Sequence, residues 1–159
     1  MSAPAGTTVT EAAGRLPASK VRSLRRSCFA TFVMLAVQFG LGIYVNLFVT
    51  VPGADHGGGF GQAIANGPAG LTLHIAVGLL LIVAAIGFLV QAVRSRQAGL
   101  ITAAVIGLLA MIGAAGSGST FTNAGHDSAS MAMGVLAVAG LLCYGISLYL
   151  LPQPRPAGS

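Results

Sequence analysis

The sequence predicts an all-α membrane protein: a four-helix transmembrane bundle that runs up-down-up-down with both termini in the cytoplasm. The first observation is that 55% of the 159 residues are hydrophobic and only 7% are charged, whereas soluble domains carry charges on about a quarter of their residues. The second is a set of four apolar stretches, each long enough to cross a bilayer, at about residues 27–51, 70–93, 99–116 and 126–151. We therefore expect one membrane-embedded domain and no separate soluble domain.

Residues 1–26 are rich in small and polar side chains and are expected to form a disordered, basic cytoplasmic tail. The apolar stretch that follows is longer than the 7–15 residues of a signal peptide, so we interpret it as a retained first span. Within it, Gln38, Gly42 and Asn46 are spaced four residues apart and share one helix face. Two interpretations stay open: a packing seam towards neighbouring helices, or a cofactor pocket lined by Gln38 and Asn46.

A glycine-rich loop follows the first span, with six glycines between residues 52 and 69. This composition disfavours regular structure, although a short helix around residues 60–65 is expected to cap the bundle. The loop lacks the GxxxxGK[ST] pattern of a phosphate-binding loop. It contains Asp55 and His56, and we expect His56 to be solvated rather than a ligand.

The second span carries one ionisable residue, His74, near its start. Ionisable side chains inside a span are rare and usually functional. The short connection over residues 94–97 requires spans two and three to be antiparallel neighbours, and span three is expected to be a packing helix followed by an outer turn over residues 117–125. Span four is opened by His126, and a stripe of small residues lies on one face below it, at Ser130, Gly134 and Ala137.

The basic residues predict the orientation. They lie before span one, between spans two and three, and after span four, at Arg15, Lys20, Arg22, Arg25, Arg26, Arg94, Arg96 and Arg155. By the positive-inside rule, both termini and the residue 152–159 tail are cytoplasmic, in the inner (plasma) membrane of the cell. This distribution explains the net charge of +5, so no nucleic-acid partner is expected. Cys28 and Cys143 lie in spans and are expected to be buried thiols without a disulfide.

The two span histidines form the candidate site. Spans two and four run in the same direction and should be diagonal partners, which places His74 and His126 near the outer face across the bundle core. Two neutral imidazoles suit the two axial positions of a haem iron, most simply a b-type haem, whereas they are too few for structural zinc. For the other nitrogen of His74 we expect the Gly70 carbonyl as acceptor. Alternatives are histidines that are merely hydrogen-bonded, and a thioether from Met131 or Met133 in place of His126.

The chain resembles a single four-helix half of the haem A synthase family. The resemblance covers about Cys28 to Leu150 and rests on QFGLG at residues 38–42, an outer loop, a span with an early histidine, and GLLAMIGAAGSGS before His126. Members typically hold two such halves in tandem, each with histidines on its second and fourth helices. The resemblance implies a haem-binding bundle with His74 and His126 as the iron ligands.

The chain departs from the family's pattern at two features, one of which is associated with the family's catalytic half. The family's catalytic half has an acidic residue shortly before the first histidine, but residues 70–73 are Gly-Leu-Thr-Leu, and the outer-loop cysteine pair of some members is absent. Asp55 is a weak candidate for a catalytic residue; Asp55 and Asp127 are the only acids expected outside the cytoplasmic side. A half-size chain would also need a homo-oligomer to restore the tandem arrangement.

The sequence therefore favours an integral membrane haem protein for electron transfer or haem handling in respiratory-chain biogenesis, with a membrane redox or assembly partner. One alternative is an oxidoreductase, a half-size haem A synthase that acts as a homo-oligomer. Another is an accessory membrane subunit without a cofactor. Whether the chain is an enzyme stays open at this point.

Overall fold

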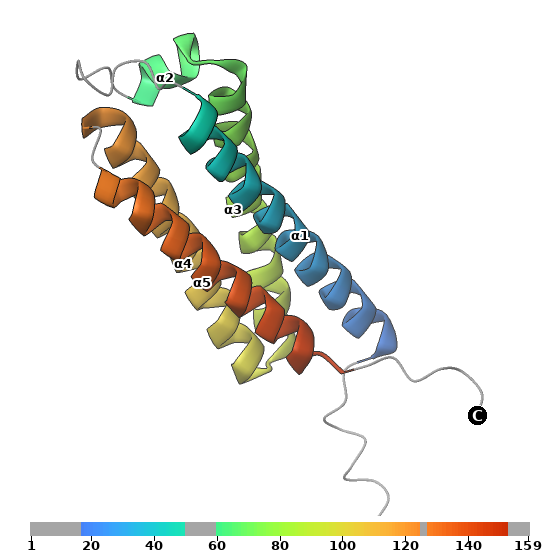
Figure 1. Ribbon diagram of the computed structural model, residues 1–159. Helices are drawn as coiled ribbons and strands as arrows, with labels where there is room; N and C mark the ends of the chain where they lie inside the picture. The colour runs from blue at the N-terminus through green and yellow to red at the C-terminus, as the bar shows by residue number, and fades with distance from the viewer. Residues whose placement is uncertain (1–16, 50–59, 125–126, 153–159) are drawn as a thin grey trace, which may run out of the picture.

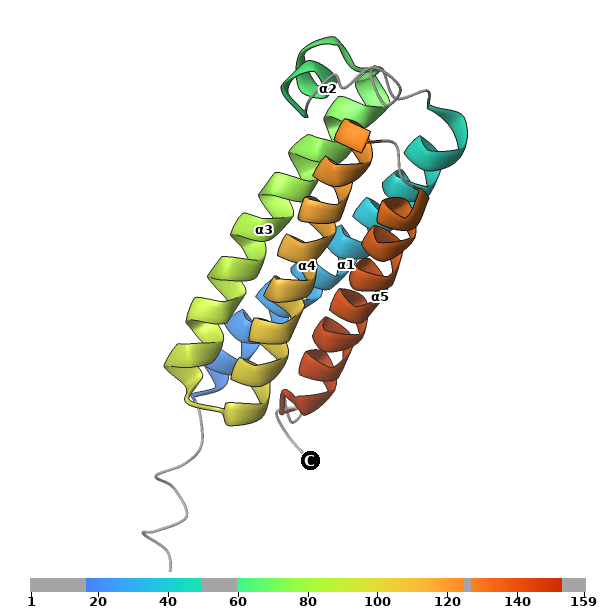
Figure 2. The same ribbon diagram turned by 90° about the vertical axis from the view of Figure 1, so that its left-hand side faces the viewer.

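The computed structural model describes residues 17–49, 60–124 and 127–152. These residues form four long helices and one short one, which are α1 (Ala18–Phe48), α2 (Phe60–Asn66), α3 (Ala69–Ser95), α4 (Ala98–Ala124) and α5 (Asp127–Leu150). The four long helices lie side by side as a bundle (Figures 1 and 2). Each is long and apolar enough to cross a membrane. The predicted fold class, an all-α four-span membrane protein, is confirmed.

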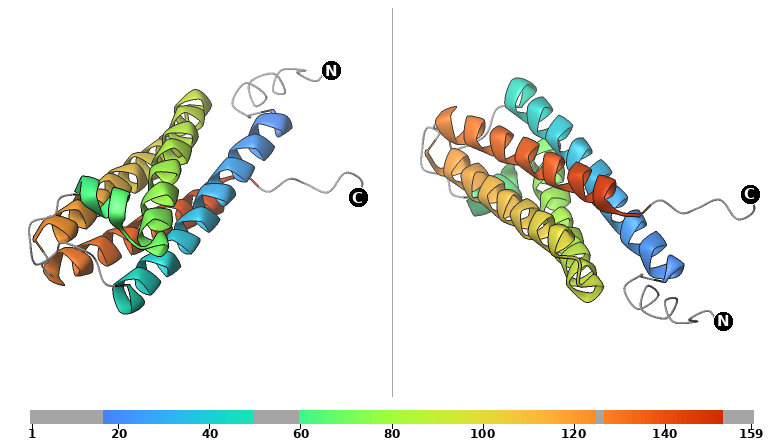
Figure 3. Two further views of the ribbon diagram at one scale, coloured as in Figure 1. Left: turned by 90° about the horizontal axis from the view of Figure 1, so that it is seen from above. Right: turned by 90° about the horizontal axis from the view of Figure 1, so that it is seen from below.

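The order of the helices around the bundle also agrees with the prediction. Helix α1 packs against α3 and α5, and α4 packs against the same two helices. Helices α3 and α5 are diagonal partners: among the described residues their backbones do not pack against each other (Figure 3), although side chains meet across the bundle axis, as Phe88 and Tyr144 do. Helix α1 begins and α5 ends at one end of the bundle, which we call the terminal end. Helix α2 packs on α3 and α4 at the opposite end, the α2 end, where a short capping helix was expected.

The tight connection between α3 and α4 lies at the terminal end. Arg96 adopts the left-handed conformation, with φ of 57°, and its N–H bonds to the carbonyl of Val93. The N–H of Gln97 bonds to Ser95 Oγ at 3.4 Å. A left-handed residue after the last helical turn is a common way to end a helix. It reverses the chain within two residues and makes α3 and α4 antiparallel neighbours, as predicted.

Two helices are longer than the sequence indicated. Helix α1 begins at Ala18 rather than near residue 27, so the last part of the predicted tail is helical and carries Lys20, Arg22, Arg25 and Arg26. Val21 and Leu24 are buried against the bundle, at 8% and 3% exposure. Their burial stabilises the additional turns, since tertiary packing contributes most of a helix's stability.

Helix α4 continues to Ala124, so the outer turn predicted over residues 117–125 is wrong. Its hydroxyl side chains bond to preceding carbonyls of the same helix: Ser117 to Gly113 at 3.0 Å, and Thr122 to Ser119 at 2.9 Å. Serine and threonine favour turns when their hydroxyls compete for backbone groups, but bonds of this kind are compatible with a helix. The polar composition of residues 117–125 therefore predicted a turn, whereas in the structure helix α4 continues through this segment to Ala124.

The terminal half of the bundle is densely packed around Tyr144. This side chain is fully buried, and its ring lies 5.6 Å from that of Phe88. The thiol of Cys28, also fully buried, donates to the Tyr144 carbonyl at 3.4 Å. Cys143 is half-buried, and both cysteines are free, as predicted. Large hydrophobic side chains cover the outer surface of the bundle, as expected where helices face lipid.

Candidate functional site

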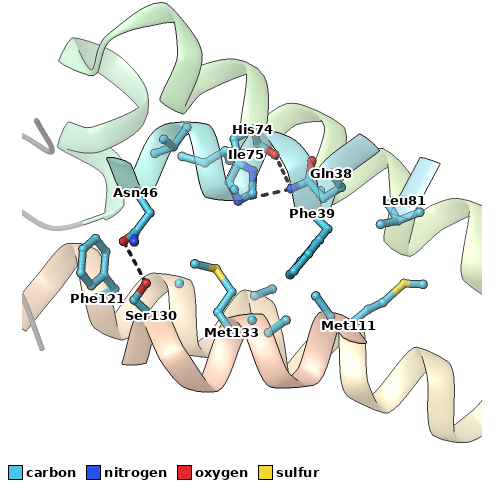
Figure 4. Close-up of a pocket in the computed structure, with 18 of the residues that line it drawn as sticks. Gln38, Phe39, Asn46, His74, Ile75, Leu81, Met111, Phe121, Ser130 and Met133 are labelled. Carbon is cyan, nitrogen blue, oxygen red and sulfur yellow. Dashed lines mark hydrogen bonds between the residues drawn. The ribbon is translucent and has the colours of Figure 1, made fainter. Parts of the chain in front are cut away.

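A cavity of about 610 Å³ lies between the four long helices. It is lined by residues 35–46 of α1, 71–82 of α3, 111–122 of α4 and 130–137 of α5, so it occupies the α2 half of the bundle (Figure 4). Most of the lining is apolar. The polar side chains among it are Gln38, Asn46, His74, Ser119, Thr122 and Ser130. A cavity of this size, mainly apolar with a few polar groups, is typical of sites that bind small molecules or cofactors.

The cavity exists because small residues face the bundle axis at this level. Each of the four helices contributes at least one, at Gly42, Gly78, Ala114, Ala115, Gly118, Gly134 and Ala137. In the terminal half the corresponding space is filled by Tyr144 and Phe88, which are both fully buried. The sequence thus divides the bundle into a closed half and a hollow half.

His74 and Gln38 form the polar wall of the cavity. Gln38 Nε2 donates to the His74 backbone carbonyl at 2.8 Å, and the same nitrogen lies 3.4 Å from His74 Nε2. Two atoms of this pair, Gln38 Oε1 and His74 Nδ1, are buried without a hydrogen-bond partner among the described residues. The expected acceptor for His74, the Gly70 carbonyl, is therefore not used. Buried polar atoms without partners are rare and costly, and they often mark a site that binds something further.

Helix α5 forms the opposite wall. Ser130 Oγ donates to Asn46 Oδ1 at 2.9 Å and connects α5 to α1 at the mouth of the cavity. Met133 lies one turn deeper, and its side chain points into the cavity from the side opposite His74 (Figure 4). His74 is five positions after the start of α3 and Met133 is six positions after the start of α5. Because these helices run in the same direction, the two side chains lie at similar depth.

The predicted site residues have different outcomes. Gln38, Asn46 and His74 all line the cavity, so the predicted α1 face does point into the bundle, and so does the Ser130, Gly134 and Ala137 stripe of α5. His126, Asp55 and His56 lie outside the described residues. Whether any of these side chains binds a cofactor stays a prediction.

Ser119 and Thr122 also line the cavity, and sequence reasoning missed them because it assigned them to a turn. Their spacing of three residues is the signal that could have placed both on one helix face. Within the described part of the chain, no three His, Cys, Asp or Glu side chains gather as a metal cluster. The described lining of the cavity therefore offers the imidazole of His74 and the thioethers of Met111, Met131 and Met133 as ligands, not a carboxylate or thiolate set.

Comparisons of the chain with protein-family models, with curated proteins and with solved structures found no match.

Proposed function

We propose that this four-span membrane protein binds a haem, most simply b-type, in the cavity of the α2 half, with His74 as one axial ligand of the iron. The observation that carries the proposal is the position of His74: an imidazole on the wall of a largely apolar cavity of about 610 Å³. Its Nε2 atom makes only a long contact of 3.4 Å to Gln38. A haem bound there would supply electron-transfer chemistry, and the protein would orient it and tune its potential.

The lining fits such a group. The apolar side chains of all four helices suit a porphyrin ring, and the Asn46 amide nitrogen and the Ser119 hydroxyl suit its carboxylates as hydrogen-bond donors. Cofactor sites in helical bundles are commonly built from side chains of facing helices in this way.

For the second axial ligand we retain His126, which directly precedes α5 and was predicted from the sequence. Met133 is the candidate among the described residues, because it faces His74 across the cavity (Figure 4). His126 is seven positions before Met133 in the sequence. A His/Met pair would raise the reduction potential relative to a pair of histidines.

One observation favours a second candidate, an accessory membrane subunit without a cofactor. Gln38 already contacts both the His74 carbonyl and its ring nitrogen, at 2.8 and 3.4 Å. A histidine held in this way could serve only to connect α1 and α3, since hydrogen bonds between helices are a general device of membrane proteins. The Nδ1 atom of His74, which has no hydrogen-bond partner within the described part of the chain, and the size of the cavity favour the haem proposal over this one.

The orientation belongs to the same proposal. Six basic residues of the described chain lie at the terminal end, at Lys20, Arg22, Arg25, Arg26, Arg94 and Arg96. With this end in the cytoplasm, the cavity lies near the outer face of the membrane. A haem there suits exchange of electrons or of haem with a partner at that face.

The decisive experiment is an absorption spectrum of the detergent-purified, full-length protein, recorded oxidised and then reduced after supply of haem. A low-spin reduced spectrum with split bands that is lost in His74→Ala supports the proposal. A colourless protein that binds no added haem would leave the accessory subunit as the better account. Extraction of a hydroxylated or oxidised haem from cells that make only this chain would instead favour the half-size haem A synthase.

A further inference from the structure

A second cavity lies at the terminal end, between α1 and α3, far from the His74 site. It has a volume of about 490 Å³ and is lined by Ser19, Arg22, Ser23, Arg26, Ser27 and Gln91. Every lining side chain is polar or charged. The proposed haem function uses none of them.

The wall of this cavity is held by hydrogen bonds between the two helices. Gln91 Nε2 donates to Ser27 Oγ at 3.0 Å, and Ser23 Oγ donates to Gln91 Oε1 at 3.3 Å. Gln91 Nε2 also lies 3.3 Å from the Gly87 carbonyl of its own helix. The carboxamide therefore joins α3 to two successive turns of α1 and fixes the spacing of the cavity wall. The hydrogen-bonding groups of Gln91 are used within the wall, so the donors left for a ligand are the guanidinium groups and the hydroxyls of Ser19 and Ser27.

The two arginines give the cavity a strong positive charge. Arg22 and Arg26 are one helical turn apart, and both are exposed. Among the residues with described side chains there is no Asp or Glu, so neither guanidinium has a carboxylate partner there. Arg94 and Arg96 lie at the same end of the bundle. Guanidinium groups bind phosphate oxygens through paired hydrogen bonds, which makes a phosphate group the natural ligand of this site.

The same face of α1 continues towards the membrane centre as an apolar surface. Positions 22, 26, 29, 33 and 37 follow helical spacing, and Phe29, Val33 and Val37 are 57%, 41% and 55% exposed. Fifteen positions of helix cover about 22 Å along the axis. A cationic site at the end of a span, followed by an exposed apolar face of that length, matches the shape of a phospholipid: a charged headgroup and an acyl chain.

We propose that the terminal end holds an anionic phospholipid, with its phosphate between Arg22 and Arg26 and an acyl chain along Phe29, Val33 and Val37. Two guanidinium groups without a carboxylate partner among the described side chains favour a headgroup with net negative charge. The amine of a zwitterionic headgroup would lie among like charges. Basic pockets beside transmembrane helices are known sites for anionic lipids.

The test is lipid binding by the detergent-purified, full-length protein, measured by native mass spectrometry during titration with phosphatidylglycerol or phosphatidylcholine. We expect preferential retention of phosphatidylglycerol, and Arg22→Gln with Arg26→Gln should weaken it about 10- to 30-fold. The matched control is Arg94→Gln with Arg96→Gln, which removes the same charge at the same end and should change the affinity by less than about 3-fold. Arg22→Lys with Arg26→Lys keeps the charge, and intermediate binding by this variant would support the guanidinium contacts.

Three results would overturn the proposal. One is equal retention of the two lipids by the unmodified protein. Another is an equal loss of phosphatidylglycerol affinity in the two Arg→Gln pairs, which would show that binding depends on net charge and not on Arg22 and Arg26 in particular. The third is full competition by millimolar inorganic phosphate, which would identify a site for the free anion. If the Arg22 and Arg26 pair fails to fold, Gln91→Leu retains every charge and should still weaken phosphatidylglycerol binding, because it removes the hydrogen bonds that hold the wall.

Discussion

The imidazole of His74 on α3 lies directly against Gly42 on α1: a Cβ atom added to that glycine would be 3.1 Å from His74 Cε1. The relationship is reciprocal one turn away, where a Cβ on Gly78 would lie 3.0 Å from Gln38 Nε2. Each helix thus contributes a polar side chain and a glycine four positions apart, and each polar side chain lies on the other helix's glycine. This arrangement sets the close approach of α1 and α3 and fixes where the imidazole enters the cavity.

The first prediction concerns this contact. Gly42→Leu should destabilise the protein by about 1–3 kcal/mol, because a large side chain in a packed interface forces the neighbouring helix and His74 to move. It should also lower haem content if His74 binds the iron. Stability can be measured by reversible unfolding in mixed detergent micelles, and haem content by absorbance.

Gly40→Leu is the matched control. A Cβ at Gly40 meets nothing within 4 Å, so this change adds the same side chain to the same helix without crowding a neighbour. It should leave both stability and haem content nearly unchanged. Equal behaviour of the two variants would show that the Gly42 contact does not position His74.

The helical period was sufficient to predict which faces point inward. Gln38, Gly42 and Asn46 line the cavity because a spacing of four places side chains on one face, and the same holds for Ser130 and Gly134. The partners on that face were not predictable. Gln38 meets His74 and Gly78, whereas Asn46 meets Ser130 of α5, and this choice depends on how the helices are shifted along one another, which no local pattern encodes.

Helix ends were predicted least well, for a related reason. Residues 18–26 and 117–124 are polar enough to suggest a tail and a turn, yet both are helical. In α1 the additional turns are stabilised by burial of Val21 and Leu24 against other helices, and in α4 by hydroxyl groups that bond within the helix. The amino-acid composition of a segment indicates whether it prefers water or lipid. It does not indicate whether the segment is helical when, as here, the helix is stabilised by contacts that form only in the folded bundle.

The second prediction tests the closed half of the bundle. Tyr144 is fully buried, and its hydroxyl has no hydrogen-bond partner among the described residues. Tyr144→Phe should therefore be neutral or stabilising, because it removes an unsatisfied polar group and keeps the ring. Tyr144→Ala should cost about 3–5 kcal/mol through the cavity it leaves.

A companion change crowds the same ring. A Cβ at Gly107 would lie only 2.9 Å from Tyr144 Cε2, and the same ring also packs against Phe88, with the ring centroids 5.6 Å apart. Gly107→Ala should destabilise the protein despite the better helix propensity of alanine, whereas Gly87→Ala, with nothing within 4 Å, should not. Unfolding in mixed micelles checks both. A large cost for Tyr144→Phe would reveal a partner for the hydroxyl and contradict the prediction.

The third prediction is topological. A reporter fused after Ser159 should be cytoplasmic and one inserted at Gly58 should be external, because all eight Lys and Arg residues lie at positions assigned to one side. Paired alkaline phosphatase and green fluorescent protein fusions measure this directly. External labelling of a cysteine introduced at Gln97, between α3 and α4, would reverse the orientation and with it the outward position of the cavity.

The last prediction concerns the iron ligands and separates His126 from Met133. His74→Ala should abolish low-spin haem, because His74 is the only histidine among the described residues and lies on the cavity wall. His126→Ala should convert the haem to a high-spin, weakly held form, whereas Met133→Leu, which preserves side-chain volume, should keep the low-spin spectrum. His56→Ala serves as the control and should change little.

The alternative ligand pair, His74 with Met133, predicts the reverse result for the two variants. Met133 faces His74 across the cavity at similar depth, so a His/Met pair predicts loss of the low-spin spectrum in Met133→Leu and its retention in His126→Ala (Figure 4). The reduction potential distinguishes the two before any mutation, since thioether ligation raises it. Because Met133 also lies 3.3 Å from the position of a Cβ on Gly118, the loss of packing must be separated from the loss of a ligand. Met133→His does this: restored low-spin haem at a lowered potential would identify position 133 as the ligand, while an unchanged spectrum would leave that role to His126.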